Sequence, residues 1–196
     1  GGAPRGGGGG GGGRIAVVFN SSASVNGFTG QMSAYGGSGY TAGGAGTIYT
    51  KPYSTSQGSA VVVLDNGGQA GTNSGWPLGG TSDLILRNGA ALGLPISSQT
   101  LFGNVLISSN AWIYVAGSAG LNGPTLNVNG NVTIQAGGGI IADSGGYSYS
   151  NGGMGPGGGI YSGYASSGGG FGGCGGASGG SPASPGGKTV GLVSTG

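Results

Sequence analysis

The chain has 196 residues, of which 57 are glycine, and it carries five basic and three acidic side chains for a net charge of +2. It contains no histidine and no glutamate, which excludes serine-hydrolase triads, Cys–His catalytic pairs and the common zinc sites within the chain. So few charges argue against nucleic-acid binding, and they leave a surface that repels neighbours weakly and favours association.

Cys174 is the only cysteine, so no disulfide can form within the chain. We expect it to be a small residue in a crowded tract, with a bridge between chains as the alternative. The sequence has no initiator methionine and no apolar stretch of membrane-spanning length. It is therefore expected to be a mature product or a piece of a longer protein, with no membrane span.

The chain begins with a glycine-rich segment, residues 1–13, in which Gly6–Gly13 is an unbroken run of eight glycines. Glycine brings no apolar area and loses much backbone entropy on ordering, so such a run is either a flexible linker or an extended helix held by its backbone. Extended threefold helices make no internal hydrogen bonds, so several of them can lie together and exchange backbone hydrogen bonds. We predict an extended segment of this polyglycine type.

Residues 14–143 are predicted to form one β domain. In its first third, residue pairs two apart alternate with Gly, Ser and Asn clusters, which is typical of short strands. These pairs are Ile15 with Val17, Met32 with Ala34, Ile48 with Thr50, and Val61 with Val63.

The second half of this domain contains an internal repeat. Segments that begin at Asp83, Asn104 and Asn131 align without gaps, and their starts lie 21 and 27 residues apart. In each, an apolar pair two residues apart is followed six residues later by another apolar residue. The pairs are Leu84 and Leu86, Val105 and Ile107, Val132 and Ile134, and the later residues are Leu92, Ile113 and Ile140. The period of two predicts a strand, and the small residues between predict a corner before the next strand.

Short strands joined by corners and repeated at about 20 to 25 residues are typical of a parallel β-helix, whose coils bury one another's inward faces. The predicted fold is therefore all-β, a short parallel β-solenoid with glycine-rich extended segments and essentially no α-helix. The alternative is an antiparallel sandwich, in which Asn66-Gly67, Asn88-Gly89 or Asn129-Gly130 would form hairpin turns.

A second glycine-rich tract, residues 144–187, precedes a terminal strand, residues 188–196. The tract carries tyrosines, which could cover a bundle of extended helices or stack on sugar rings. The candidate stacking residues are Trp76, Tyr147, Tyr149, Tyr161 and Tyr164. They favour an alternative function as an adhesin or carbohydrate-binding module.

Three stretches of the first half, Gly12–Val17, Gly30–Gly37 and Gly43–Tyr49, resemble a glycine-rich repeat of very large secreted or surface proteins of environmental bacteria. The stretch Gly168–Gly176 is similar to the tract that links such repeats. The resemblance implies an extracellular β-helical structural or adhesive role and carries over no catalytic residue. In composition alone, the tract also resembles the polyglycine bundles of phage tail-tip adhesins and of small glycine-rich antifreeze proteins.

The three aspartates have no second catalytic group near them in the sequence. Asp83 shares its repeat position with Asn104 and Asn131, while Asp65 and Asp143 each begin a turn sequence. We therefore predict no catalysis, no metal site and no cofactor.

The predicted function is that of an extracellular or cell-surface structural protein, a self-assembling filament subunit or a segment of a surface fibre. Open solenoid ends expose strand edges that pair with the next copy, and head-to-tail contacts of this kind propagate. The predicted partner is the chain itself, and surface glycans are a further candidate. The residues expected at the assembly interface are Ile15, Val17, Val190, Leu192 and Val193. Ice binding is a minor alternative, because the threonines form no regular ladder.

Overall fold

The computed structural model describes residues 6–23, 27, 29–76, 81–94, 99–115, 125–143, 167–168, 170, 173–179 and 186. The chain divides into two compact units. The first comprises Gly1–Pro95, Gln99–Tyr114 and Thr125–Ile141, and the second comprises Ile96–Ser98, Val115–Pro124 and Ala142–Gly196.

The chain is all-β, as predicted, and within the described residues its helical structure is limited to the short 3₁₀ turn Thr55–Gln57. All the described strands lie in the first unit. Their bounds are β1 Arg14–Val18, β2 Thr47–Lys51, β3 Val61–Asp65, β4 Ser74–Gly75, β5 Ser82–Arg87, β6 Ala91–Gly93, β7 Gln99–Ile107, β8 Trp112–Tyr114, β9 Thr125–Val128, β10 Val132–Ile134 and β11 Gly139–Ile141.

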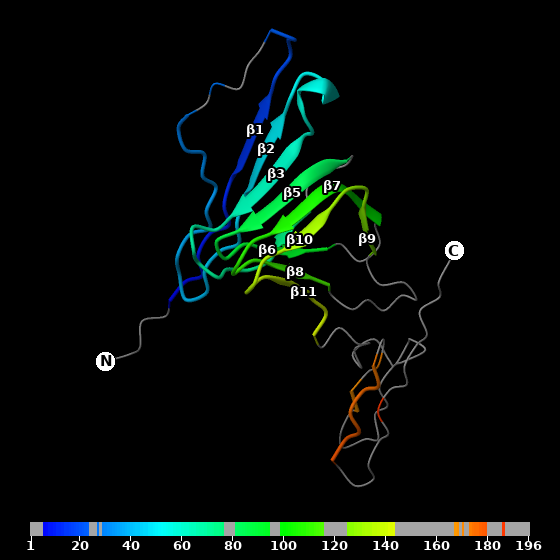
Figure 1. Ribbon diagram of the computed structural model, residues 1–196. Coiled ribbons are helices and arrows are strands. Elements are labelled where there is room, and N and C mark those ends of the chain that lie inside the picture. Colours follow the sequence, from blue (N-terminus) through cyan, green and yellow to red (C-terminus); the bar gives the residue numbers. More distant parts are fainter. Residues whose placement is uncertain are drawn as a thin grey trace. The chain divides into compact units, whose positions relative to one another are not determined.

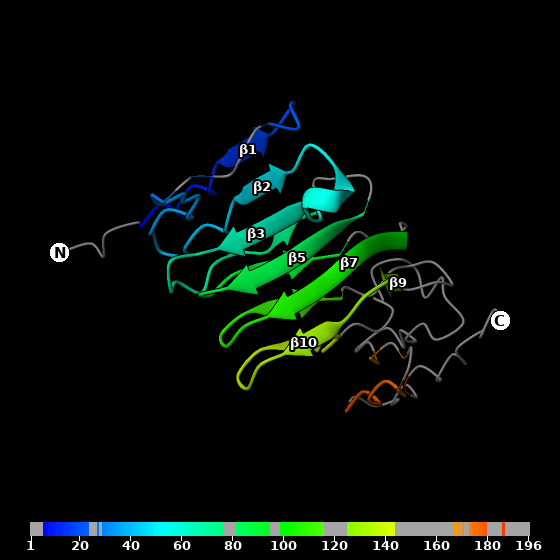
Figure 2. The same cartoon turned by 45° about the horizontal axis from the view of Figure 1, so that its top comes forward.

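The strands form two sheets (Figure 1). The larger sheet has the order β1-β2-β3-β5-β7-β10, with β9 also paired to β7, and the smaller sheet has the order β11-β8-β6-β4. From β3 onward, β3, β5, β7 and β10 of the larger sheet are each followed by a strand of the smaller sheet, with β9 preceding β10. All the pairs among these strands are parallel. Figure 2 shows the larger sheet from β1 at one edge to β10 at the other.

The strand register matches the repeat seen in the sequence. In the larger sheet Leu84 pairs with Val105, and Val105 pairs with Val132. In the smaller sheet Ile113 pairs with Leu92 on one side and with Ile140 on the other. These partners occupy equal positions in the three aligned segments, so the alignment predicted which residues lie next to one another.

The sheets are not uniformly parallel, because β2 pairs with β3 in the antiparallel sense. The physical reason is the place of the segment that leads into β2. Residues 41–46 run directly into β2 and are bonded to the segment that follows β3, since Thr72 N–H donates to the Ala42 carbonyl and Asn66 Nδ2 donates to the Gly43 carbonyl. β2 therefore begins at the end of the sheet where β3 ends, and β1 runs parallel to β2. The strand predicted at Met32 and Ala34 is wrong, because this segment carries no strand and its backbone bonds to glycine instead.

The corners between the two sheets share one backbone conformation. The aligned residues Gly89, Asn110 and Gly137 have φ of 82°, 56° and 83°, a left-handed region that glycine and asparagine adopt most readily. Stacked corners also bond to each other: Gly89 N–H donates to the Asn110 carbonyl at 2.7 Å, and Asn110 N–H donates to the Gly137 carbonyl at 2.8 Å. Asn88-Gly89 is thus a corner between sheets and not the hairpin turn of a sandwich.

The core consists of the apolar residues of the first two aligned segments and their neighbours. The fully buried apolar side chains are Val62, Leu64, Leu84, Leu86, Phe102, Val105 and Ile107 from the larger sheet and Leu92 and Ile113 from the smaller one. Burying a side chain of this size stabilises a fold by about 1.5–3 kcal/mol. The small corner residues Ala90 and Ala111 are also fully buried, which lets successive corners lie close together.

Residues 6–13, 34–40 and 41–46 form what we call the glycine bundle, whose backbones exchange hydrogen bonds at intervals of three residues. The bonds run from Gly9 N–H to Thr41 O (2.9 Å), Gly12 N–H to Gly44 O (2.9 Å), Gly37 N–H to Gly10 O (2.7 Å), Tyr40 N–H to Gly7 O (3.0 Å), Gly43 N–H to Gly37 O (2.9 Å) and Gly46 N–H to Ala34 O (2.7 Å). An interval of three is the repeat of an extended threefold helix. The initial glycine run is therefore held by its backbone.

Steric contact explains why glycine is needed at some of these positions. A Cβ atom placed on Gly9 would lie 1.9 Å from the Gly37 carbonyl oxygen, and one on Gly12 would lie 2.0 Å from the Ala34 carbonyl oxygen. At Gly7, Gly10 and Gly13, which are themselves three residues apart, a Cβ atom would have no neighbouring atom within 4 Å. The requirement for glycine thus follows the same interval as the hydrogen bonds.

Close backbone contact recurs within the described part of the second unit. Gly168 N–H donates to the Gly176 carbonyl at 2.9 Å, and a Cβ atom on Gly186 would lie 1.8 Å from the Gly175 carbonyl oxygen. Cys174, which lies in sequence between Gly168 and Gly175, is exposed and has a free thiol.

Candidate assembly interface

The larger sheet has one edge at β1. This strand pairs with β2, and within the described residues no strand lies on its other side. Ile15 and Val17, two of the residues predicted at the interface, are half-buried, and their neighbour Val18 is exposed. Strand edges of this kind present free N–H and C=O groups to any chain that can pair with them.

The register also aligns apolar residues in a row across this sheet. Ile15 pairs with Ile48, Ile48 with Val63, Val63 with Ile85, and Ile85 with Leu106. These residues alternate with the fully buried Val62, Leu64, Leu84, Leu86, Val105 and Ile107, so they lie on the opposite face of the sheet. Of this row only Ile48 is buried, and the other four are half-buried. The sequence carries a signal for this row that we did not use: runs of three or four consecutive aliphatic residues, which are typical of strands covered on both faces.

The opposite edge, at β10 and β11, leaves apolar residues open to solvent. Val132, Ile134 and Ile140 have exposed fractions of 48%, 45% and 41%, whereas Val105, Ile107 and Ile113 at the same positions of the preceding aligned segment have 1%, 0% and 0%. The difference arises because β7 and β8 are flanked on both sides, by β5 and β10 in the larger sheet and by β6 and β11 in the smaller one. Within the described residues, no strand covers the far side of β10 and β11.

A ladder of side chains runs along the start of the repeat and ends at this same edge. Asp83 Oδ1 accepts a hydrogen bond from Asn104 N–H at 2.7 Å, and Asn104 Oδ1 accepts one from Asn131 N–H at 3.0 Å. Each of these two side chains therefore accepts a hydrogen bond from a backbone N–H of the next aligned segment. Asn131 is the last member, and its exposed side chain has no hydrogen-bond partner among the described residues. The sequence alignment placed these three residues at one position but did not predict the ladder.

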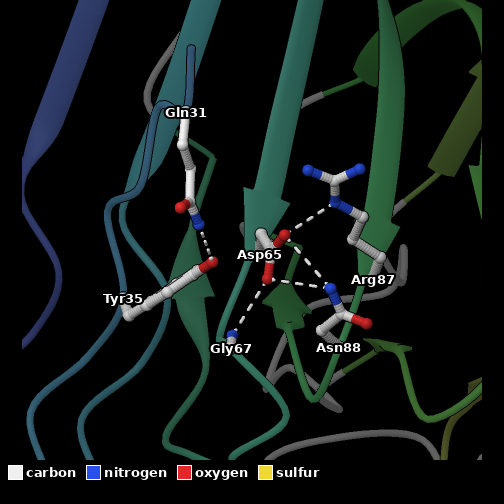
Figure 3. A network of polar contacts seen from close by, with 6 residues as sticks. All are labelled: Gln31, Tyr35, Asp65, Gly67, Arg87 and Asn88. Atoms are coloured by element: carbon white, nitrogen blue, oxygen red, sulfur yellow. Dashed lines mark hydrogen bonds and ion pairs between the residues drawn. The ribbon is translucent and has the colours of Figure 1, made fainter.

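A polar network fixes the corner after β3 (Figure 3). The carboxylate of Asp65 accepts hydrogen bonds from Arg87 Nε at 2.7 Å, from Gly67 N–H at 2.9 Å and from Asn88 Nδ2 at 3.1 Å. Asp65 is buried, with 5% of its side chain exposed, while 48% of the Arg87 side chain is exposed. Buried charge is tolerated only when it is paired and hydrogen-bonded. The geometry therefore gives Asp65 a structural role, and Asp83 is likewise engaged in its ladder.

The neighbouring Asn66 joins this corner to the glycine bundle. Its side chain is fully buried. Its Oδ1 accepts from Gly36 N–H at 2.8 Å, and its Nδ2 donates to the carbonyls of Gly43 at 3.1 Å and Gln69 at 2.8 Å. One amide thus ties two segments of the bundle to the turn after β3, and it satisfies backbone groups of three residues, of which Gly36 and Gly43 are buried.

Of the aromatic candidates, only Trp76 lies within the described residues. Trp76 is half-buried and packs edge-on against the fully buried Phe102, with ring centroids 4.6 Å apart and planes at 70°. Trp76 therefore contributes to the packing around Phe102, and its role in ligand stacking stays a prediction. Exposed tyrosines that we did not predict as ligand contacts are Tyr35, Tyr40 and Tyr53, with 39%, 89% and 52% exposed.

Several predicted site residues lie outside the described residues. They are Tyr147, Tyr149, Tyr161 and Tyr164 among the stacking candidates, and Val190, Leu192 and Val193 among the assembly candidates. Their roles stay predictions. The structure therefore brings together Ile15 and Val17 at one edge, and adds Asn131, Val132, Ile134 and Ile140 at the other.

Searches of family models, curated proteins and solved structures found no match to this chain. Within the described residues, no helix has the length and hydropathy needed to cross a membrane. Nor does that part of the chain hold a cluster of three or more His, Cys, Asp or Glu residues able to bind a metal ion.

Proposed function

We propose that this chain is an extracellular structural protein that assembles head to tail with copies of itself, as a filament subunit or as a segment of a surface fibre, and that it has no catalytic role. The observation that carries the proposal is the difference in burial between the last two aligned segments. Val105, Ile107 and Ile113 are fully buried, while the residues at the same positions of the last segment, Val132, Ile134 and Ile140, are almost half exposed. Exposed apolar residues at a strand edge favour addition of a further strand.

The proposed architecture behind this function is a short parallel β-helix. Its coils are β3 with β4, β5 with β6, β7 with β8, and β10 with β11. The parallel pairing within both sheets and the stacked left-handed corners support it. The glycine bundle would act as three extended threefold helices that cover the N-terminal side of the smaller sheet, where Thr72 N–H donates to the Ala42 carbonyl at 3.1 Å.

The apolar row on the outer face of the larger sheet supports association as well. Val63, Ile85 and Leu106 are only half-buried there, and a net charge of +2 opposes contact between copies only weakly. The extracellular location rests on the resemblance to glycine-rich repeats of secreted and surface proteins.

Sedimentation and electron microscopy of the purified chain over a range of concentrations test this function. We expect fibres whose mass grows with concentration, with a repeat of about 4.7 Å along the fibre axis in diffraction. Because apolar burial and backbone pairing drive the proposed contact, assembly should change little when the ionic strength is raised. A compact monomer at every concentration would refute the proposal, and glycan binding by such a monomer would favour the adhesin alternative.

A further inference from the structure

The edge formed by β10 and β11 has the features of an acceptor site for one more parallel strand. In the two preceding coils, the strand that follows supplies three things: a backbone ladder, an N–H group for the Asp or Asn side chain, and apolar residues that cover the inner face. At the last coil all three partners are missing from the described residues. The missing occupant is thereby specified in chemical terms.

The occupant must be a strand with two apolar residues two apart, preceded by a residue with a free N–H. The ladder fixes its register as well. The residue opposite Asn131 donates its N–H to Asn131 Oδ1, as Asn131 itself does to Asn104. The next residue and the one two further on then cover Val132 and Ile134.

The chain contains one such segment beyond Ile141. In the sequence after that residue, Val190 and Leu192 are the only aliphatic pair two residues apart, and Thr189 precedes them. Thr189-Val190-Gly191-Leu192 matches Asn131-Val132-Thr133-Ile134 in the positions of its apolar residues. Neither Thr189 nor Val190 is a proline, so both can donate to the ladder.

We propose that the β10 edge binds residues 189–193 of a second copy of this chain as an added parallel strand, with Thr189 opposite Asn131, Val190 opposite Val132 and Leu192 opposite Ile134. The inference rests on the proposed function and names the contact that would carry it. In this contact each chain supplies one acceptor edge, at β10, and one donor segment, residues 189–193. Pairing between copies is therefore heterologous and continues without closing. Main-chain hydrogen bonds supply affinity in such strand addition, and the apolar positions fix the register.

Two full-length variants separate the two halves of this contact. The donor-blocked chain carries Val190→Asp and Leu192→Asp, and the acceptor-blocked chain carries Ile134→Asp, at a residue exposed enough to accept a charge without unfolding. Each variant alone should need a concentration about tenfold or more above that of the wild type to assemble. An equimolar mixture should form heterodimers and nothing larger, because each heterodimer keeps only a blocked donor and a blocked acceptor.

Matched controls place the same charge on comparable residues outside the contact. Tyr53→Asp changes an exposed apolar residue outside the strands, and Ser194→Asp changes the residue that follows the donor segment. Both should assemble as the wild type does. Asn131→Ala removes only the side-chain acceptor and should weaken assembly less, by about fivefold.

The outcomes distinguish the inference from the function. If the blocked variants form fibres as readily as the wild type, the inference is overturned and the proposed function stands on another surface. If the wild type is monomeric at every concentration, both are overturned. In that case faster amide exchange in β10 of the donor-blocked monomer would show that the chain's own terminal segment occupies the edge. A heterodimer from two variants that are each monomeric supports the proposal and also shows that both variants are folded.

Discussion

Alanine substitutions along the glycine run should alternate in effect at intervals of three residues. At Gly9 the new Cβ would lie 1.9 Å from the Gly37 carbonyl oxygen, and at Gly12 it would lie 2.0 Å from the Ala34 carbonyl oxygen. Normal contact is about 3.5 Å, so the backbone segments must separate. At Gly10, where nothing lies within 4 Å, no movement is needed.

The size of the difference follows from two terms. Forced overpacking costs about 1–3 kcal/mol, and loss of the Gly9 N–H bond to the Thr41 carbonyl adds roughly 0.5–1.5 kcal/mol. Gly9→Ala should therefore destabilise the fold by about 2–4 kcal/mol. Gly10→Ala should stabilise it by about 0.4–1 kcal/mol, because alanine restricts the unfolded chain.

Thermal unfolding followed by circular dichroism measures both effects. For a chain of this size each kcal/mol shifts the Tm by about 2–4 °C. Gly9→Ala and Gly12→Ala should lower the Tm by roughly 5–15 °C, while Gly10→Ala and Gly13→Ala should raise it slightly. Equal Tm values for the two sets would show that the run does not pack backbone against backbone in the way described. Faster amide exchange at Gly12 in the Gly9→Ala variant would show that the loss begins in the bundle.

Substitutions at three further residues test the corners and the polar network. Asn66→Ala should destabilise the fold by about 2–4 kcal/mol in urea unfolding, because it leaves buried backbone groups of the glycine bundle without partners; a loss below about 0.5 kcal/mol would mean that the amide does not join the two parts. Arg87→Met should cost about 1 kcal/mol, since the guanidinium is half exposed while the Asp65 carboxylate stays buried; an unchanged urea midpoint would contradict this pairing. Asn110→Gly should be nearly neutral and Asn110→Val should cost about 1–2 kcal/mol, because the residue has a positive φ; equal midpoints for these two variants would contradict the left-handed corner.

The repeat and its register could be predicted from the sequence because a strand repeats every two residues. Apolar residues at Leu84, Val105 and Val132 align without gaps, and side chains that must face one core have to be in register when strands stack. The small residues between the apolar positions predicted a corner, but the left-handed backbone at Gly89 and Asn110 was not predicted. All-β structure was therefore correctly predicted.

The direction of β2 and the structure around Ala34 could not be predicted in this way. Glycine has no side chain and hence no periodicity, so the sequence does not reveal which glycine segments pair or in which direction. The bundle comprises residues 6–13 and 34–46, and it includes Ala34, for which the sequence predicted a strand. Where no side chain selects a partner, backbone hydrogen bonds formed across distant segments decide the arrangement.

For the candidate interface, the sequence by itself determined the low charge, the absence of His and Glu, and the repeated apolar positions of the three aligned segments. Only the tertiary structure decided which segment lies at the edge, since Val105 and Val132 look alike in sequence but have exposed fractions of 1% and 48%. Composition sets how much apolar surface a chain has. Its place in the stack decides how much of that surface neighbouring strands cover and how much is left to bind a partner.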